Sequence, residues 1–310
     1  MTRIGLGLAA LGRPAYITLG RTDDLGARDA GARSVEALEA RTHAMLDAAW
    51  DAGVRYVDAA RSYGYAERFL GSWLAARPGR REELTIGSKW GYAYVGAWDV
   101  DAPVHEAKEH SLARFEAQWP ETLDALGTRP DVYLVHSVTP DSPVLGDGAL
   151  LDALGALAAT GVRVGISTSG PAQGDVLDAA RTLRGTPFSA VQATWNLLEP
   201  SAGAALARAH EDGWFVVVKE ALANGRLTAR GDVPGVGALA ADDGQSVDAF
   251  AVGAAAAQPW ADVVLSGAVT VEQLTSNLTA RGPRVDGRAI AVLAEDPATY
   301  WAERAALPWG

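Results

Sequence analysis

The chain has 310 residues, no cysteine and a formal net charge of −11. Without cysteine it has no disulfides, thiolate metal sites or cysteine nucleophiles. The acidic excess disfavours binding to nucleic acid or anionic membranes, both of which need clustered lysine and arginine. No apolar run reaches the roughly 18–20 residues of a membrane span, and the N-terminal stretch lacks the apolar core of a secretory signal. We therefore expect a cytoplasmic protein with a small-molecule partner, and the sequence does not indicate its oligomeric state.

Short apolar runs alternate with longer amphipathic segments along the chain. Eight runs are typical of buried strands, and they are Arg3–Leu8, Arg55–Asp58, Leu84–Ser88, Asp131–His136, Val162–Ser167, Ala190–Ala193, Trp214–Val218 and Asp262–Leu265. Segments with helical spacing separate them, among them Ala37–Trp50, His110–Leu126, Leu150–Ala159 and Val247–Ala257. This alternation indicates parallel strands joined by crossover helices. Eight repeats favour an α/β fold of the closed (β/α)8 or TIM-barrel type, with residues 1–310 forming a single domain.

Three segments do not fit the repeat. Residues 12–33 and 91–104 would be long loops between a strand and the following helix. Residues 286–310 would form a terminal helix and then an aromatic tail that contains Tyr300, Trp301 and Trp309. In such barrels the loops after the strands build the active site. The two long loops are therefore candidates for ligand binding.

Polar side chains stand at or just after the ends of three successive predicted strands. Asp58 ends the second strand, Lys89 follows the third, and His136 ends the fourth. Tyr63 comes five residues after Asp58. Because the carboxyl ends of barrel strands meet at one rim, we expect these four side chains to converge. A strand-end aspartate can also cap a helix, and a single histidine is often a core residue, but their succession favours catalysis.

Together the four side chains could reduce a carbonyl group. Reduction delivers hydride to carbon and a proton to oxygen. A tyrosine hydroxyl, with an ordinary pKa near ~10, becomes a useful acid where its phenolate is stabilised. Lys89 would stabilise the phenolate, Asp58 would keep Lys89 charged, and a neutral His136 would orient the substrate oxygen. This division of roles predicts Tyr63 as the proton donor.

The segment Gly53–Gly71, which reads GVRYVDAARSYGYAERFLG, resembles the signature of the aldo-keto reductase family. Ile86–Lys89 and Asp131–His136 resemble the lysine and histidine strands of that family. The resemblance implies NAD(P)H-dependent reduction of an aldehyde or ketone, or the reverse oxidation of an alcohol or sugar. It also implies a nicotinamide cofactor bound without a Rossmann domain. The implied catalytic tetrad is Asp58, Tyr63, Lys89 and His136.

Further matches to the family imply the cofactor contacts. They are Gly7, Leu8, Asp58, Ser167, Thr168, Gln192, Lys219, Leu222, Asn224, Ser266, Gly267, Gln273 and Asn277. Thr168 departs from the family's usual asparagine and offers fewer hydrogen bonds than an amide. Members of the resembled family usually bind NADPH, so the resemblance leads us to expect NADPH first, with NADH as the alternative. Gly267 and Gln273 stand where many relatives carry lysine or arginine for the 2′-phosphate, and their lack of charge favours NADH.

Lys219 stands where relatives often carry an aromatic ring against the nicotinamide. A cation there would repel the oxidised ring relative to the reduced one and favour reduction, although the adjacent Glu220 could cancel much of this effect. For the substrate we expect a pocket walled by Trp90, Tyr92 and Trp195. The chemical class of the carbonyl stays open.

Two other functions remain open. A lysine at a barrel strand end also suits a Schiff-base lyase that uses Lys89, but that function leaves Tyr63 and Gln192 unexplained. Some members of the resembled family act as cofactor-sensing regulatory subunits without catalysis, and the intact tetrad favours an enzyme. The five histidines show no paired ligand spacing, so we expect no metal site.

Overall fold

The computed structural model describes residues 3–19, 24–25 and 31–309. Eight parallel strands close into a barrel in the order β1-β10-β9-β8-β7-β6-β3-β2. The strands are β1 (Arg3–Gly7), β2 (Tyr56–Asp58), β3 (Thr85–Trp90), β6 (Val132–Val138), β7 (Arg163–Thr168), β8 (Ala190–Thr194), β9 (Phe215–Lys219) and β10 (Val263–Ser266). The predicted single-domain (β/α)8 barrel is confirmed, because each predicted strand coincides with one of these to within one or two residues.

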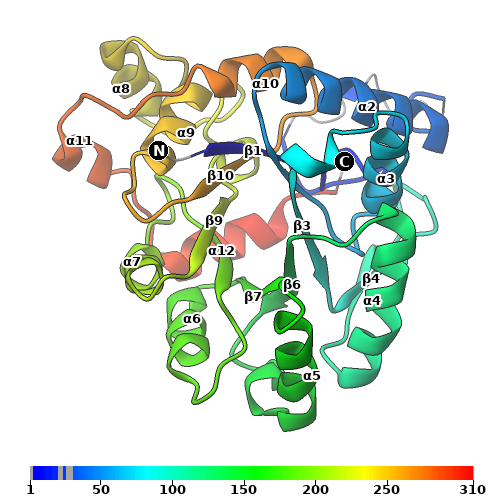
Figure 1. Cartoon of the computed structure of the whole chain (residues 1–310). Helices are drawn as coiled ribbons and strands as arrows, with labels where there is room; N and C mark the ends of the chain where they lie inside the picture. The colour runs from blue at the N-terminus through cyan, green and yellow to red at the C-terminus, as the bar shows by residue number, and fades with distance from the viewer. Residues whose placement is uncertain (1–2, 20–23, 26–30, 310) are drawn as a thin grey trace.

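Helices surround the strands in chain order (Figure 1). They are α2 (Val35–Asp51), α3 (Ala66–Ala75), α4 (Leu112–Leu126), α5 (Gly148–Ala158), α6 (Gln173–Thr182), α7 (Gly203–Glu211), α9 (Val247–Ala256) and α10 (Val271–Leu278). The additional helix α8 (Val236–Asp243) precedes α9, and the short 3-10 turns are η1 (Arg81–Glu83), η2 (Pro143–Gly146) and η3 (Ala223–Gly225). Within the described ranges, no helix has the length and apolar character that crossing a membrane requires.

Local capping determines where several helices begin. The side-chain oxygens of Ser34, Ser111 and Ser246 accept hydrogen bonds from backbone N–H groups in the first turns of α2, α4 and α9. These bonds satisfy donors that would otherwise lack a partner at a helix start. Gly127 follows α4 in the left-handed conformation, with φ 63°, and ends that helix.

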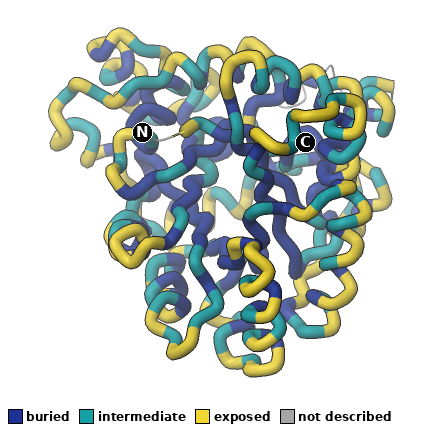
Figure 2. Tube along the Cα trace, in the orientation of Figure 1, coloured by how far each residue is buried: buried dark blue, intermediate teal, exposed yellow. Residues whose placement is uncertain are grey.

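Apolar side chains fill both the barrel and the layer between strands and helices. Figure 2 shows buried chain in the centre and exposed chain on the outer helices and loops. Tyr56 of β2 lies 5.9 Å, between ring centroids, from Phe215 of β9. These two strands are not neighbours in the barrel, so the two rings meet across its interior. The barrel is therefore a packed core, and a ligand site has to lie at one of its ends.

Two of the segments outside the repeat differ from expectation. Part of the predicted loop 91–104 is a strand, because β4 (Tyr92–Tyr94) pairs antiparallel with β5 (Glu106–Lys108). At the C-terminus there are two helices, α11 (Gly287–Ala291) and α12 (Pro297–Ala306), so Tyr300 and Trp301 lie within a helix rather than in a tail. Asp296 caps α12 and Pro297 suits its first position. Of the predicted loop 12–33, residues 20–23 and 26–30 lie outside the described residues.

Candidate active site

A cavity of about 590 Å³ opens at the carboxyl ends of the barrel strands. This volume lies within the ~300–1,000 Å³ typical of small-molecule sites. At one end its walls include Tyr63 and His136, and at the other they include Gln273 and Asn277 of α10. The loop after β1, η3 and the C-terminal segment complete the walls. The cavity is therefore elongated across the rim, from β2 and β6 to β10.

Asp58 and Lys89 form a buried ion pair beneath Tyr63. The Lys89 ammonium donates to the Asp58 carboxylate and, at 2.9 Å, to the Ala59 carbonyl oxygen. The Gln192 amide donates to Asp58 Oδ1 at 2.8 Å. The Lys89 Nζ atom lies 4.6 Å from the centroid of the Tyr63 ring. Because these partners hold both charges in place, Lys89 can favour the phenolate form of the tyrosine.

His136 contacts the tyrosine from β6. The two rings are nearly perpendicular, with centroids 5.5 Å apart, and the Tyr92 ring lies 5.0 Å from the imidazole. The Nδ1 atom of His136 lies 3.4 Å from Ser62 Oγ. Burial, together with the charge of Lys89, lowers the pKa of His136 well below its usual value. The imidazole is therefore neutral near pH 7 and suits a hydrogen bond to a substrate oxygen.

Tyr63 is protonated at neutral pH. Burial and the nearby Asp58 carboxylate raise the pKa of its hydroxyl well above the usual value, and Arg13 opposes them. Its side chain nevertheless lines the cavity. A tyrosine hydroxyl in this environment holds a proton that can be given to an oxygen at the cavity end.

The loop that carries Tyr63 is held by the loop after β1. The Tyr65 backbone N–H donates to the Gly12 carbonyl oxygen at 2.7 Å. A Cβ atom added at Gly12 would overlap the Tyr63 carbonyl oxygen and the backbone of Ala66. Gly64 adopts φ +60°, a conformation that favours glycine. The two loops thus cross backbone against backbone, which fixes the height of Tyr63 at the rim.

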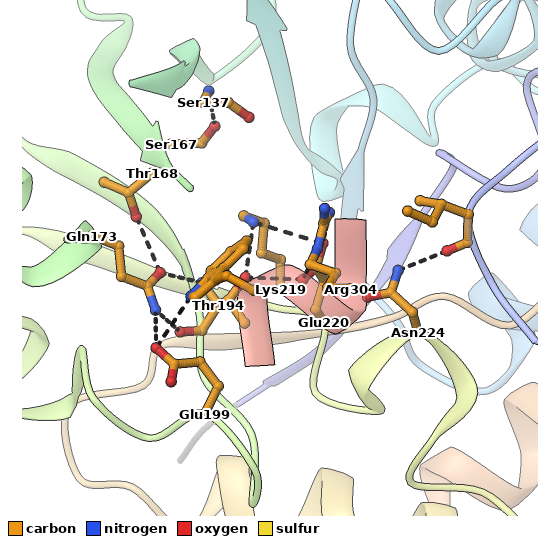
Figure 3. Close-up of polar contacts among 12 residues, drawn as sticks. Ser137, Ser167, Thr168, Gln173, Thr194, Glu199, Lys219, Glu220, Asn224 and Arg304 are labelled. Carbon is orange, nitrogen blue, oxygen red and sulfur yellow. Dashed lines mark hydrogen bonds and ion pairs between the residues drawn. The ribbon is translucent and has the colours of Figure 1, made fainter. Parts of the chain in front are cut away.

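A charged cluster of Lys219, Glu220 and Arg304 lines the cavity at the end of β9 (Figure 3). Lys219 Nζ donates to Thr194 Oγ1 at 2.9 Å and lies 3.9 Å from the Glu220 carboxylate. Arg304 of α12 pairs with Glu220 through Nε at 2.9 Å and through a second nitrogen. Burial lowers the pKa of Lys219 to about 8. Burial alone would raise the pKa of Glu220, but Arg304 and Lys219 bring it down to about 2.

The far end of the cavity is built from β10, α10 and the loop after β1. Gln273 accepts from the Val269 N–H at 2.9 Å and donates from Nε2 to the Asp24 carboxylate at 2.8 Å. Ser266 Oγ donates to Asn277 Oδ1 at 2.7 Å. These contacts leave amide and hydroxyl groups around a polar end of the cavity. The sequence-predicted cofactor residues in the cavity wall are Gly7, Asp58, Gln192, Lys219, Leu222, Asn224, Ser266, Gly267, Gln273 and Asn277.

Three sequence-predicted cofactor residues do not line the cavity. Leu8 is fully buried in the apolar core. Ser167 Oγ accepts a hydrogen bond from the Ser137 N–H at 2.7 Å, and Thr168 Oγ1 lies 3.5 Å from Gln173 Oε1 (Figure 3). Both side chains are fully buried. Their hydroxyls have partners inside the protein, and their assignment as cofactor contacts stays a prediction.

Two of the three aromatic residues predicted to wall the substrate pocket are not among the residues that line the cavity. Trp90 is fully buried and packs on Phe115 of α4, with ring centroids 5.2 Å apart. It follows Lys89 in β3, and successive side chains of a strand point to opposite faces, so Trp90 faces the helix layer. Trp195 packs at 6.0 Å on Trp260. Tyr92 does line the cavity.

Several cavity residues were not anticipated from the sequence. They are Arg13, Tyr16, Glu106, Arg304 and Trp309, which come from the loop after β1, from β5 and from the C-terminal segment. None of them stands in a local motif, because tertiary contacts alone bring them to the rim. Among the residues that the structure describes, no three histidine, aspartate or glutamate side chains gather as a metal site would require.

Comparison with known proteins identifies the family. The model of the aldo/keto reductase family matches residues 4–287. A D-threo-aldose 1-dehydrogenase from Pseudomonas sp is 46% identical over 50 residues, which are 16% of this chain and only 15% of that enzyme.

Two solved structures show the same fold. The holo form of an aldo-keto reductase from Bacillus halodurans has a TM-score of 0.70 and 20% identity, over 95% of this chain and 92% of that one. A glycerol dehydrogenase from Gluconobacter oxydans has a TM-score of 0.67 and 22% identity, over 97% and 92%. Because the family model matches nearly the whole chain, the chain belongs to the aldo/keto reductase family.

Proposed function

We propose that this protein is an NAD(P)H-dependent oxidoreductase that reduces an aldehyde or ketone, or oxidises the corresponding alcohol, with Tyr63 as the acid and base. The observation that carries the proposal is the convergence of Tyr63, His136 and the buried Lys89–Asp58 pair at one end of an elongated cavity. Family membership supports the same reaction class.

The groups along the cavity fit a nicotinamide dinucleotide. The Gln192 amide faces the cavity beside Asp58, and Ser266 and Asn277 supply polar groups at the other end. Gly267 leaves open space there, since an added Cβ atom would meet nothing within 4 Å. The N-terminus of α10 is adjacent, and helix N-termini favour phosphate groups. When bound, the nicotinamide supplies the hydride.

The chain's own residues handle the proton and orient the carbonyl. His136 is neutral and would hold the substrate oxygen beside the Tyr63 hydroxyl. Tyr63 then gives its proton to that oxygen, and Lys89 stabilises the phenolate that remains. Asp58 keeps the ammonium charged. In alcohol oxidation the same phenolate accepts the proton.

The position of Lys89 speaks against a Schiff-base lyase. Its side chain is fully buried, paired with Asp58 and covered by the Tyr63 ring. It is not among the residues that line the cavity. A Schiff-base lysine must be neutral and must reach the substrate carbonyl. The ion pair with Asp58 opposes the first condition and burial opposes the second.

The charges at the far end of the cavity favour NADH over NADPH, in contrast to the expectation from family habit. The carboxylates of Asp24, Asp248 and Glu272 line this end. The guanidinium of Arg230 also lines it, and two hydrogen bonds of 2.7 and 2.5 Å already join it to Asp24. An acidic residue suits the free ribose hydroxyls of NADH, whereas a 2′-phosphate calls for an available cation. A 2′-phosphate would add negative charge beside these carboxylates.

The polar walls near Tyr63 favour a hydroxyl-rich substrate. Glu106, Ser137 and Glu220 contribute hydrogen-bonding groups there. One similar protein is named a D-threo-aldose 1-dehydrogenase and another a glycerol dehydrogenase, and both names denote substrates rich in hydroxyl groups. We therefore place aldoses and polyols first among the substrates to test.

The test follows reduced-nicotinamide absorbance with NADH and NADPH in parallel, over a panel of aldoses, polyols, aldehydes and ketones. Tyr63→Phe is expected to lower kcat by about 10²–10⁴-fold, because general acid catalysis contributes that much. Its cofactor affinity, measured by quenching of tryptophan fluorescence, should stay close to that of the unmodified protein. Full activity in Tyr63→Phe, or no cofactor binding to either protein, would overturn the proposal.

A further inference from the structure

Arg13, in the loop after β1, is a buried cation within an aromatic cage. Its side chain is 3% exposed. The guanidinium carbon lies 5.2 Å from the centroid of the Tyr63 ring, 5.1 Å from that of Tyr16 and 4.9 Å from that of Trp309. A guanidinium at such distances interacts favourably with each ring, and more strongly where water is excluded. The proton donor therefore contacts a second cation besides Lys89.

Directed hydrogen bonds hold the guanidinium in this place. One nitrogen donates to Glu106 Oε1 at 2.8 Å and to the Ser62 carbonyl oxygen at 3.1 Å. The Nε atom donates to the Ala9 carbonyl oxygen at 3.3 Å. Ser62 directly precedes Tyr63, so Arg13 both contacts the Tyr63 ring and donates to the backbone of the loop that carries it. Glu106 lies on β5, so the ion pair joins the loop after β1 to the β4–β5 hairpin.

We propose that Arg13 is a positioning residue for proton transfer, which stabilises the phenolate form of Tyr63 together with Lys89, and that Glu106 moderates this effect by partly neutralising Arg13. The inference rests on the proposed function. It adds a residue outside the tetrad that adjusts the acidity of the proton donor. It also gives the β4–β5 hairpin a part in catalysis, through the carboxylate of Glu106.

The surrounding charges determine the direction of each contribution. The titratable and charged groups near the Tyr63 hydroxyl are Arg13 and Tyr16 from the loop after β1, Asp58 from β2, Lys89 from β3, Glu106 from β5, His136 from β6 and Glu220 after β9. Burial raises the pKa of Tyr63 most, and Asp58, Glu106 and Glu220 raise it further. Arg13 lowers it. Removing Arg13 or Glu106 should therefore move the acidity of Tyr63 in opposite directions.

The experiment compares Arg13→Met, Arg13→Lys and Glu106→Gln with the unmodified protein. The first readout is the pH dependence of kcat/KM for carbonyl reduction and for alcohol oxidation. The second is the ¹³C shift of the Tyr63 ring carbon that bears the hydroxyl, in protein labelled at that atom, with Tyr63→Phe used to assign the signal. The NMR readout needs no turnover. Thermal unfolding confirms that each variant is folded.

Arg13→Met is expected to move the titration of Tyr63 upward by about 1–2 pH units, because a charge within about 4–6 Å changes a pKa by that order. Glu106→Gln is expected to move it downward, since it removes the negative charge that pairs with Arg13. In Arg13→Lys, which keeps the positive charge, Tyr63 should titrate at a pH between those of the unmodified protein and Arg13→Met. If Arg13→Met fails to fold, the downward movement in Glu106→Gln still decides the question.

Two results would overturn the inference. One is a loss of activity in Arg13→Met and Glu106→Gln with pH profiles and Tyr63 shifts unchanged, which is the outcome of a purely structural role. The other is a shift of the Tyr63 titration in the same direction in both variants. Failure of the proposed function looks different, because the unmodified protein would then show no turnover while the opposite movements of the Tyr63 signal would still be measurable.

Discussion

At the scale of single residues, the site depends on charges that are removed from water and held by partners. Lys89 is fully buried and Asp58 nearly so. Each would be costly to bury alone, and the pair persists because Ala59 and Gln192 satisfy the remaining hydrogen bonds. The same burial lowers the pKa of His136 and raises that of Tyr63. One environment thus leaves a neutral imidazole beside a protonated phenol.

Lys89→Met should destabilise the fold strongly. It leaves the Asp58 carboxylate buried without its cation, and breaking a buried ion pair in this way costs about 3–5 kcal/mol. Urea unfolding followed by circular dichroism measures the loss. The double variant Asp58→Asn/Lys89→Met removes both charges and should recover part of the lost unfolding free energy. A single-variant loss below about 1 kcal/mol would contradict the argument.

Lys219 should make the choice between oxidised and reduced cofactor depend on pH. Burial lowers the pKa of Lys219 to about 8, so it is charged below that pH and neutral above it. Its positive charge repels the cationic oxidised nicotinamide, and Glu220 offsets this incompletely because it also pairs with Arg304. The Kd ratio of oxidised to reduced cofactor, measured by fluorescence titration, is expected to fall as pH rises through about 8. A Lys219→Met protein with the same pH-dependent ratio would refute this role.

At the scale of secondary-structure elements, short strands and their loops place the catalytic groups. β2 ends at Asp58, and five residues later the loop presents Tyr63. The loop after β1 crosses it at Gly12 and also contacts η3, where Asn224 donates to the Ile17 carbonyl oxygen at 2.7 Å. This loop therefore links Tyr63, the proposed proton donor, to the opposite wall of the cavity. Its close crossing at Gly12 leaves no room for a side chain.

Gly12→Ala tests the crossing of the two loops. The added methyl group would overlap the Tyr63 carbonyl oxygen, so one loop has to move. Overpacking of this kind costs about 1–3 kcal/mol of stability, and we expect a fall in kcat of at least about tenfold because Tyr63 loses its position. Gly148→Ala is the matched control, since a Cβ atom there meets nothing within 4 Å and Gly148 is not among the residues that line the cavity. Equal kcat in both variants would show that the crossing does not position Tyr63.

At the scale of the whole molecule, the cavity joins parts of the chain that are distant in sequence. Arg304 of α12 reaches Glu220, and Trp309 stacks at 4.4 Å on His105 and bridges to Ile17. Asp24 joins Gln273 to Arg230. A ligand in the cavity would contact several of these segments at once. Binding should therefore stabilise the folded state as a whole.

NADH is expected to stabilise the fold more than NADPH at equal concentration. At one hundred times its Kd a ligand raises the unfolding free energy by about 2.7 kcal/mol, which thermal or chemical unfolding detects. Asp24→Asn removes one carboxylate from the far end of the cavity, so it should narrow the difference between the two cofactors. Binding of the cofactor fragments ADP and adenosine 2′,5′-bisphosphate compares ligands without and with the 2′-phosphate in the absence of the nicotinamide. Tighter binding of the 2′-phosphorylated ligands to the unmodified protein would refute the assignment of NADH.

The sequence alone was sufficient to predict the barrel, which the structure confirms, and to propose the four tetrad positions, because both inferences depend on local patterns. Strand and helix periodicity is a property of neighbouring residues, and the strand ends carry Asp58, Lys89 and His136. Alternation along a single strand is also local, and it places Trp90 toward the helix layer, next to the inward-directed Lys89. The hairpin of β4 and β5 required a pairing that no turn motif indicated.

Only the tertiary structure decided the environment of these groups. Arg13 and Glu106 are 93 residues apart, and Glu220 and Arg304 are 84 apart, so no spacing in the sequence could pair them. Ser167 Oγ likewise accepts a hydrogen bond from the backbone of Ser137, 30 residues away. Burial and the distances between charges determine pKa values, and both are properties of the packed chain. The sequence thus determined that Asp58, Tyr63, Lys89 and His136 stand at or just after strand ends, and packing determined the other groups at the rim and the neighbours of each.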